Sequence, residues 1–122
     1  MASVASLFAP PSEVSYAASK FWVRGFTEAL NMEWERYGIH VCDIMPNFVR
    51  TAMVEQNPGK IIANSGVAFT PEDIAATVWK TLQKKRLHWL IDRPLYKLSY
   101  GIARILLPYF VVRSLLKKSA GF

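Results

Sequence analysis

Residues 12–37 read SEVSYAASKFWVRGFTEALNMEWERY, and this stretch decides the fold. Apolar residues recur along it at spacings of three and four, which predicts one long amphipathic helix that is covered on more than one side. Ser12 is the expected N-cap of this helix, and Gly38 is expected to end it. Tyr16 and Lys20 are four residues apart, so they share one face of the predicted helix.

Tyr16 and Lys20 together are suited to act as a general acid/base. A tyrosine hydroxyl has an ordinary pKa of about 10, too high for proton transfer at neutral pH. A neighbouring ammonium group favours the phenolate and so adapts the pair to that chemistry. The same spacing also occurs where a partly buried aromatic ring lies beside a solvated lysine. Two residues alone favour this second interpretation, and the neighbouring motifs decide between them.

Three motifs surround the helix in a fixed order. Ser3 lies thirteen residues before Tyr16, and the helix is followed by Gly38-Ile39-His40-Val41 and then by Pro46-Asn47-Phe48-Val49-Arg50-Thr51. In order and spacing these motifs resemble the catalytic half of the short-chain dehydrogenase/reductase family. Asn47 stands where that family usually has glycine. Because asparagine tolerates a left-handed backbone better than other non-glycine residues, the turn is expected to survive.

The resemblance covers residues 1–92 and implies an α/β fold, the C-terminal part of a Rossmann-like, doubly wound parallel sheet. It implies an NAD(P)-dependent oxidoreductase that acts on an alcohol/carbonyl pair. The catalytic residues carried over from the family motifs are Ser3, Tyr16 and Lys20. The residues carried over for binding NAD or NADP are Tyr16, Lys20, Pro46, Val49 and Thr51.

The family binds its dinucleotide through a glycine-rich turn after the first strand, and this chain contains no Gly-x-Gly sequence. The residue that would select NAD over NADP is not found either, so either NAD or NADP is a possible cofactor. We therefore interpret residues 1–92 as part of a truncated dehydrogenase, with Met1 as an internal methionine read as a start. The resemblance describes the chemistry of the family, whereas the isolated chain is expected to be inactive. The alternative function is that of an inactive fragment, or of a piece that binds a membrane or a partner without turnover.

The middle of the chain predicts a βαβ unit. Residues 39–45 and 87–91 are short apolar runs typical of parallel strands, and Thr70-Pro71-Glu72-Asp73 is typical of a helix start. Strand, helix and strand at this length predict a right-handed crossover. Residues 51–70 are expected to form a loop with a short helical piece, and the resemblance implies that this segment closes over the substrate. Their apolar side chains either indicate an apolar substrate or only anchor the loop.

Charge is distributed unevenly along the chain. Residues 1–83 hold six Lys/Arg and eight Asp/Glu, a net charge of −2, whereas residues 84–122 hold nine and one, a net charge of +8. An acidic partner is therefore expected for the tail only. Residues 93–122 lie outside the resemblance and predict a helical tail. Two arginines and a proline interrupt its apolar run, which argues against a membrane span.

We expect residues 95–118 to contact an anionic membrane peripherally. The alternative is a C-terminal helix packed against the rest of the protein or a partner chain. The helix 12–37 is expected to form a homo-oligomer, as the corresponding helix often does in the family. No nucleic-acid partner is expected.

Cysteine and histidine usage predicts neither a disulfide nor a metal site. Cys42 is the single cysteine and is expected in a buried strand. His40 and His88 flank the predicted strands, and a structural role is expected for both. Residues 1–11 lack the basic start and apolar core of a secretory signal, which predicts a cytoplasmic protein.

Overall fold

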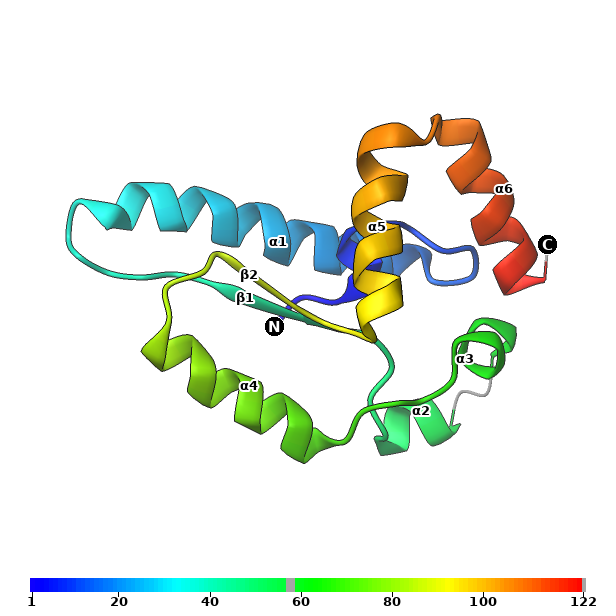
Figure 1. Ribbon diagram of the computed structural model, residues 1–122, viewed down its shortest axis with the longest axis horizontal. Coiled ribbons are helices and arrows are strands. Elements are labelled where there is room, and N and C mark those ends of the chain that lie inside the picture. The colour runs from blue at the N-terminus through cyan, green and yellow to red at the C-terminus, as the bar shows by residue number, and fades with distance from the viewer. Residues whose placement is uncertain (57–58, 122) are drawn as a thin grey trace.

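The computed structural model describes residues 1–56 and 59–121, apart from the side chain of Arg104. Figure 1 shows the order of the elements along the chain. They are η1 (Val4–Ser6), α1 (Val14–Glu35), β1 (Asp43–Pro46), α2 (Ala52–Gln56), α3 (Lys60–Ser65), α4 (Pro71–Gln83), β2 (His88–Ile91), α5 (Pro94–Leu106) and α6 (Tyr109–Ala120).

The centre of the fold is a two-stranded parallel sheet of β1 and β2. Asp43 pairs with His88 and Pro46 with Ile91. In Figure 1 the sheet lies between α1 on one side and α4 on the other. The buried core joins Ile44, Ile74 and Ile91, from β1, α4 and β2. The predicted strand–helix–strand unit and the α/β fold class are therefore confirmed.

Helix α1 begins at Val14 and ends at Glu35, two residues inside each predicted boundary. Ser12 is not its N-cap, because its backbone has a φ of 69° and Glu13 occupies the cap position. Gly38 also has a positive φ, of 72°, and its N–H donates to the Glu35 carbonyl at 2.9 Å. A backbone of this kind favours glycine, so Gly38 closes the chain reversal after the helix.

Both strands are shorter than predicted. β1 begins at Asp43 instead of residue 39, and β2 begins at His88 instead of residue 87. The pairing sets this length, because four residues of each strand face each other in register. Cys42 consequently lies half-buried just before β1, and its predicted place in a strand was wrong.

The two ends of the sheet are held by polar contacts of different kinds. His88 lies between two carboxylates, with Nδ1 3.0 Å from Asp43 and Nε2 3.1 Å from Glu28 of α1. It thereby links β2 to β1 and to the helix above them, which fits the structural role expected for it. Near the N-terminus, the Ala2 N–H donates a backbone hydrogen bond to the Ile44 carbonyl of β1 at 3.0 Å, and the turn of η1 follows.

Helix α4 begins as its sequence predicts. Thr70 Oγ1 accepts from the Asp73 N–H at 3.4 Å, and Asp73 Oδ2 accepts from the Thr70 N–H at 2.8 Å. This reciprocal pair is a capping box, with Pro71 at the first helical position. The segment before it contains two short helices, α2 and α3, where one helical piece was expected.

The tail forms a helical hairpin of α5 and α6 that turns at Pro108 (Figure 1). Proline at that position has no N–H to continue α5, so it separates the two helices. α6 returns to the body of the protein beside α3, where the Asn64 amide donates to the Ser119 carbonyl at 2.8 Å. Within residues 1–56 and 59–121, none of the helices has the length and apolar character needed to cross a membrane.

Candidate active site

The predicted site residues line one cavity of about 1180 Å³. They reach it from the N-terminal segment, from the first turns of α1 and from the turn that follows β1. They are Ser3, Tyr16, Lys20, Pro46, Val49 and Thr51. In parallel α/β sheets ligands bind at the carboxyl ends of the strands, and the turn after β1 lies at that end.

Tyr16 and Lys20 lie on the same face of α1, as their spacing predicts. Lys20 Nζ lies 5.4 Å from the centroid of the Tyr16 ring. The same ammonium donates a 3.3 Å hydrogen bond to the Met1 carbonyl. Because an ammonium group has three N–H donors, this bond leaves two for other partners. The Tyr16 side chain is exposed at the cavity, where a ligand can reach its hydroxyl.

Ser3 lies at the start of η1, and its side chain is held at the base of the cavity. Its Oγ accepts from the Ala5 N–H at 3.2 Å and donates to the Pro46 carbonyl at 3.5 Å. Ser6, which is fully buried, donates to the Ser3 carbonyl at 2.6 Å and fixes the backbone behind it. The contact of Ser3 with Pro46 is long for a hydroxyl donor, so the Ser3 hydrogen can be redirected at small cost.

The turn after β1 is tied to three parts of the structure. The Asn47 N–H donates to the Ile91 carbonyl of β2 at 3.0 Å, and Val49 forms a parallel bridge with Phe69. The Thr51 carbonyl accepts from Val54 and Glu55 at 3.0 Å each, which starts α2. These bonds fix the backbone that carries Pro46, Val49 and Thr51 to the cavity.

Asn47 is held by its side chain, and its backbone lies outside the left-handed region. The expectation that asparagine serves there by tolerating a left-handed turn was therefore wrong. Its Nδ2 donates to Asp92 Oδ2 at 2.8 Å, and its Oδ1 accepts from the Phe48 N–H at 2.8 Å.

Asp92, directly after β2, does not line the cavity but binds two residues that do, Asn47 and Tyr100, and this supporting role was not predicted. Its side chain is buried, and it accepts from Asn47, from the Tyr100 hydroxyl at 2.8 Å and from the Arg93 N–H at 2.7 Å. Burial and the hydrogen bond to Asp92 raise the pKa of Tyr100. An acidic residue directly after a predicted strand was the signal that could have identified it.

The helical hairpin supplies one wall of the cavity, so part of the tail packs against the rest of the protein, which is the alternative that its sequence left open. The residues of α5 that face it are spaced as one helical stripe, Tyr96, Ser99, Tyr100 and Ala103. α6 adds Val112, Leu115 and Leu116 to this wall. Helix α3, which lies beside α6, adds Ile61 and Ile62. Glu13 also lines the cavity, and burial raises its pKa.

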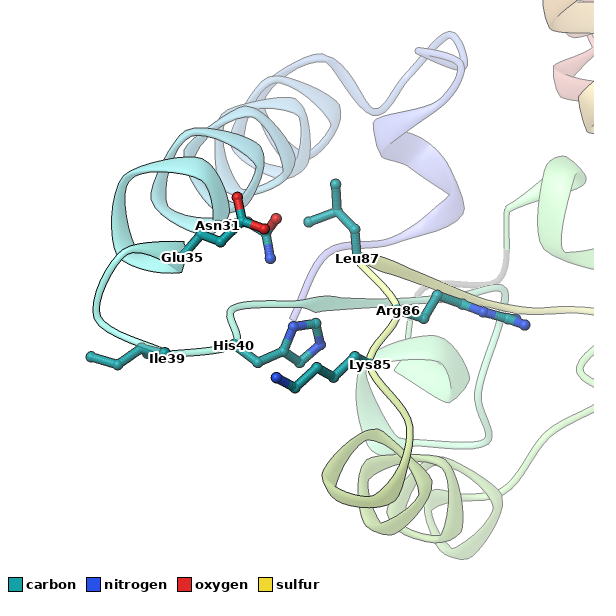
Figure 2. Close-up of a pocket in the computed structure, with 8 residues that line it drawn as sticks. Asn31, Glu35, Ile39, His40, Lys85, Arg86 and Leu87 are labelled. Carbon is teal, nitrogen blue, oxygen red and sulfur yellow. The ribbon is translucent and has the colours of Figure 1, made fainter.

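A second, smaller pocket of about 230 Å³ lies at the opposite end of the strands (Figure 2). Its lining comes from the end of α1, from the loop before β1 and from the segment before β2, and includes Asn31, His40 and Lys85. Within the described part of the chain, the buried His40 Nε2 has no hydrogen-bond partner. Because this pocket lies at the amino ends of the strands, it is not the candidate active site.

Comparison with known proteins identifies the family. A model of the short chain dehydrogenase family matches residues 1–61, which is half of the chain and includes Ser3, Tyr16 and Lys20. The chain belongs to the short-chain dehydrogenase family. The resemblance seen in the sequence motifs is therefore confirmed, and with it membership of a family of oxidoreductases.

Two relatives and one solved structure give the extent of this similarity. Oxidoreductase UcpA of Salmonella typhimurium strain LT2 is 35% identical over 81 residues, which are 66% of this chain and 29% of the relative. Dehydrogenase/reductase SDR family member 7C of Bos taurus is 30% identical over 106 residues, 80% of this chain and 34% of the relative. The chain thus spans about a third of the length of these two relatives.

The solved structure is a 4-hydroxyisoleucine dehydrogenase complexed with NADH. It matches with a TM-score of 0.61 and 28% sequence identity, over 75% of this chain and 42% of that one. This similarity supports the Rossmann-like α/β fold of the present short-chain dehydrogenase.

Proposed function

We propose that this short-chain dehydrogenase carries the catalytic residues of an NAD(P)-dependent oxidoreductase that interconverts an alcohol and a carbonyl compound. The observation that carries the proposal is the common cavity of Ser3, Tyr16 and Lys20 with the turn after β1. The three side chains come from two separate elements, and the fold brings them to the edge of the sheet where parallel α/β proteins bind ligands.

Tyr16 acts as the general acid/base. In the reducing direction its hydroxyl donates a proton to the substrate oxygen, and in the oxidising direction its phenolate takes that proton back. The Lys20 ammonium, 5.4 Å from the ring centroid, stabilises negative charge on the Tyr16 oxygen. Its remaining N–H donors serve the hydroxyl groups of the nicotinamide ribose.

Ser3 positions the substrate oxygen. Its hydroxyl exchanges the 3.5 Å contact with the Pro46 carbonyl for a shorter bond to that oxygen. The substrate oxygen then lies within hydrogen-bond reach of both Ser3 and Tyr16, which fixes its orientation for proton transfer.

The turn after β1 fits the nicotinamide end of NAD or NADP. Thr51 Oγ1 donates at 3.3 Å to the Val49 carbonyl, a long contact that can be exchanged for a ligand group. Pro46, Val49 and Thr51 would hold the carboxamide at this edge of the cavity. When bound, the nicotinamide supplies or accepts the hydride.

The lining of the cavity indicates the class of substrate. Side chains from α3, α4, α5 and α6 make most of the cavity wall apolar, which favours an apolar alcohol or ketone.

The outer face of α1 carries exposed aromatic side chains. The rings of Trp22 and Phe26 stack there, with their centroids 4.8 Å apart. We propose that a second copy of the chain covers this face.

The test is ligand binding by the purified 122-residue chain. NADH or NADPH should raise its melting temperature, because a ligand stabilises the folded state that it binds. Lys20→Met should reduce that rise, whereas Lys84→Met, an exposed lysine outside the cavity, should leave it unchanged. If neither cofactor shifts the melting temperature and no alcohol or ketone is turned over, the chain acts without turnover and the proposal is wrong.

A further inference from the structure

Helix α5 has two apolar stripes, and only one of them is used by the cavity. The inner stripe contains Tyr96, Tyr100 and Ala103. The outer stripe is exposed and consists of Leu95, Leu98, Ile102 and Ile105, of which Ile105 is 80% exposed. A helix that is apolar on two sides requires two partners, because each stripe gains stability only when it leaves water.

The outer stripe continues into the tip of the hairpin. Leu106 ends α5, Leu107 is its C-cap residue, and Tyr109 and Phe110 begin α6. Phe110 is 72% exposed, and its three neighbours at the tip are also exposed. In Figure 1 the turn between α5 and α6 projects away from the sheet and from α4. A continuous apolar patch of this kind is characteristic of an interaction site.

Charge selects the partner for this patch. Residues 93–122 contain six Lys/Arg and no Asp/Glu. Lys97 of α5 and Arg113, Lys117 and Lys118 of α6 are exposed on the same hairpin. A second copy of the hairpin would bring like charges together, which disfavours self-association through this face. An anionic lipid surface complements both the apolar tip and the basic side chains.

We propose that the α5–α6 hairpin docks the protein on an anionic lipid bilayer. The tip residues and the outer stripe of α5 insert at the level of the lipid headgroups, and the basic side chains of α6 contact the anionic headgroups. The inner stripe remains on the cavity, so the same helix separates the cavity from the bilayer. This docking does not depend on the proposed oxidoreductase activity.

The test is flotation of the purified chain with vesicles of phosphatidylcholine, alone or mixed with phosphatidylserine. Two variants each remove one contribution to binding. The tip variant combines Ile105→Ser with Phe110→Ser. The charge variant combines Arg113→Gln, Lys117→Gln and Lys118→Gln. Leu82→Ser, at a 74% exposed position on α4, is the matched control. Circular dichroism and a thermal melt show that each variant is folded.

We expect binding to the mixed vesicles that weakens as salt is added. The charge variant should bind them on the order of a hundredfold more weakly, at roughly 1 kcal/mol for each basic residue removed. The tip variant should also lose most of its binding, and the Leu82→Ser variant should keep it.

Three results would overturn the proposal. The first is a folded wild-type chain that ignores mixed vesicles at low salt. The second is equal binding to both kinds of vesicle, which excludes recognition of anionic lipid. The third is a concentration-dependent dimer in sedimentation that only the tip variant abolishes, because a second copy would then cover the hairpin.

Discussion

Asn47 donates a 2.8 Å hydrogen bond to the buried carboxylate of Asp92, and this bond joins the turn after β1 to the end of β2. The same carboxylate oxygen accepts from the Tyr100 hydroxyl of α5. One buried charged group therefore holds together a strand end, the turn proposed to bind the nicotinamide and the first helix of the hairpin. Burial of a carboxylate is costly unless donors of this kind surround it.

Replacing Asn47 by alanine should destabilise the protein by about 1.5–3 kcal/mol, because the buried Asp92 loses a donor to a charged group. Urea unfolding measures the change in free energy. Asn64→Ala is the matched control, since Asn64 is exposed and its amide donates to a neutral carbonyl, that of Ser119. Its expected cost is below about 1.5 kcal/mol. Equal losses for the two variants would show that Asp92 does not depend on Asn47.

The Tyr100→Phe variant should alter how stability depends on pH. Because the pKa of Tyr100 is raised in the folded protein, the unfolded chain releases this proton from about pH 10, while the folded chain still holds it. Its contribution to stability is thus complete below about pH 10 and is lost as the pH rises further.

Unfolding free energies at several pH values between about 8 and 11 provide the measurement. At pH 8 the variant should be less stable, because it lacks the hydrogen bond to Asp92. Above about pH 10 its stability should fall less steeply than that of the wild type. Parallel curves for the two proteins would contradict this prediction.

Substituting Tyr16 by phenylalanine should lower turnover by about 10²- to 10⁴-fold, because the proton donor is removed while the ring beside Lys20 is kept. The thermal shift produced by NADH or NADPH should remain, since the ammonium is unchanged. Tyr37→Phe, at an exposed position outside the cavity, should keep wild-type turnover. Undiminished activity of the Tyr16 variant would refute its assignment as the acid/base.

Two threonine variants of α4 should change stability in opposite directions. Thr70→Ala removes the acceptor of the capping box and should cost about 0.5–2 kcal/mol. Thr77 lies inside the same helix, where its hydroxyl donates back to the Asp73 carbonyl. Thr77→Ala should therefore stabilise the helix, because alanine has the higher helix propensity. Denaturant unfolding compares them, and a loss at Thr77 as large as that at Thr70 would argue against the capping effect.

Local patterns in the sequence predicted the elements that depend on local chemistry. The period of α1 and the capping sequence at Thr70 both involve residues within one or two turns of each other. The start of α1 was misplaced because the positive φ of Ser12, just after Pro10 and Pro11, prevents it from serving as the cap. Strand lengths were overestimated because pairing between distant segments sets them.

The sequence predicted the site residues that belong to local motifs, and it missed the contacts between residues that lie far apart in the chain. Ser3, Tyr16 and Lys20 belong to motifs with fixed spacing, whereas the partner of Asn47 lies 45 residues away. The spacing of Tyr96, Tyr100 and Ala103 in the sequence reveals that they share one face of α5. The direction of this face, however, is set by the bond from Tyr100 to Asp92, which local sequence does not reveal.

The parallel pairing of β1 and β2 also fixes an order of events during synthesis. Asp43 and His88 are register partners 45 positions apart, and parallel strands cannot pair across a tight turn. While the ribosome is still making α4, Leu87 and β2 do not yet exist, and the edge of β1 that they will occupy is open. The nascent chain therefore passes through a stage in which this edge of β1 is unpaired, and an unpaired strand edge is prone to aggregation.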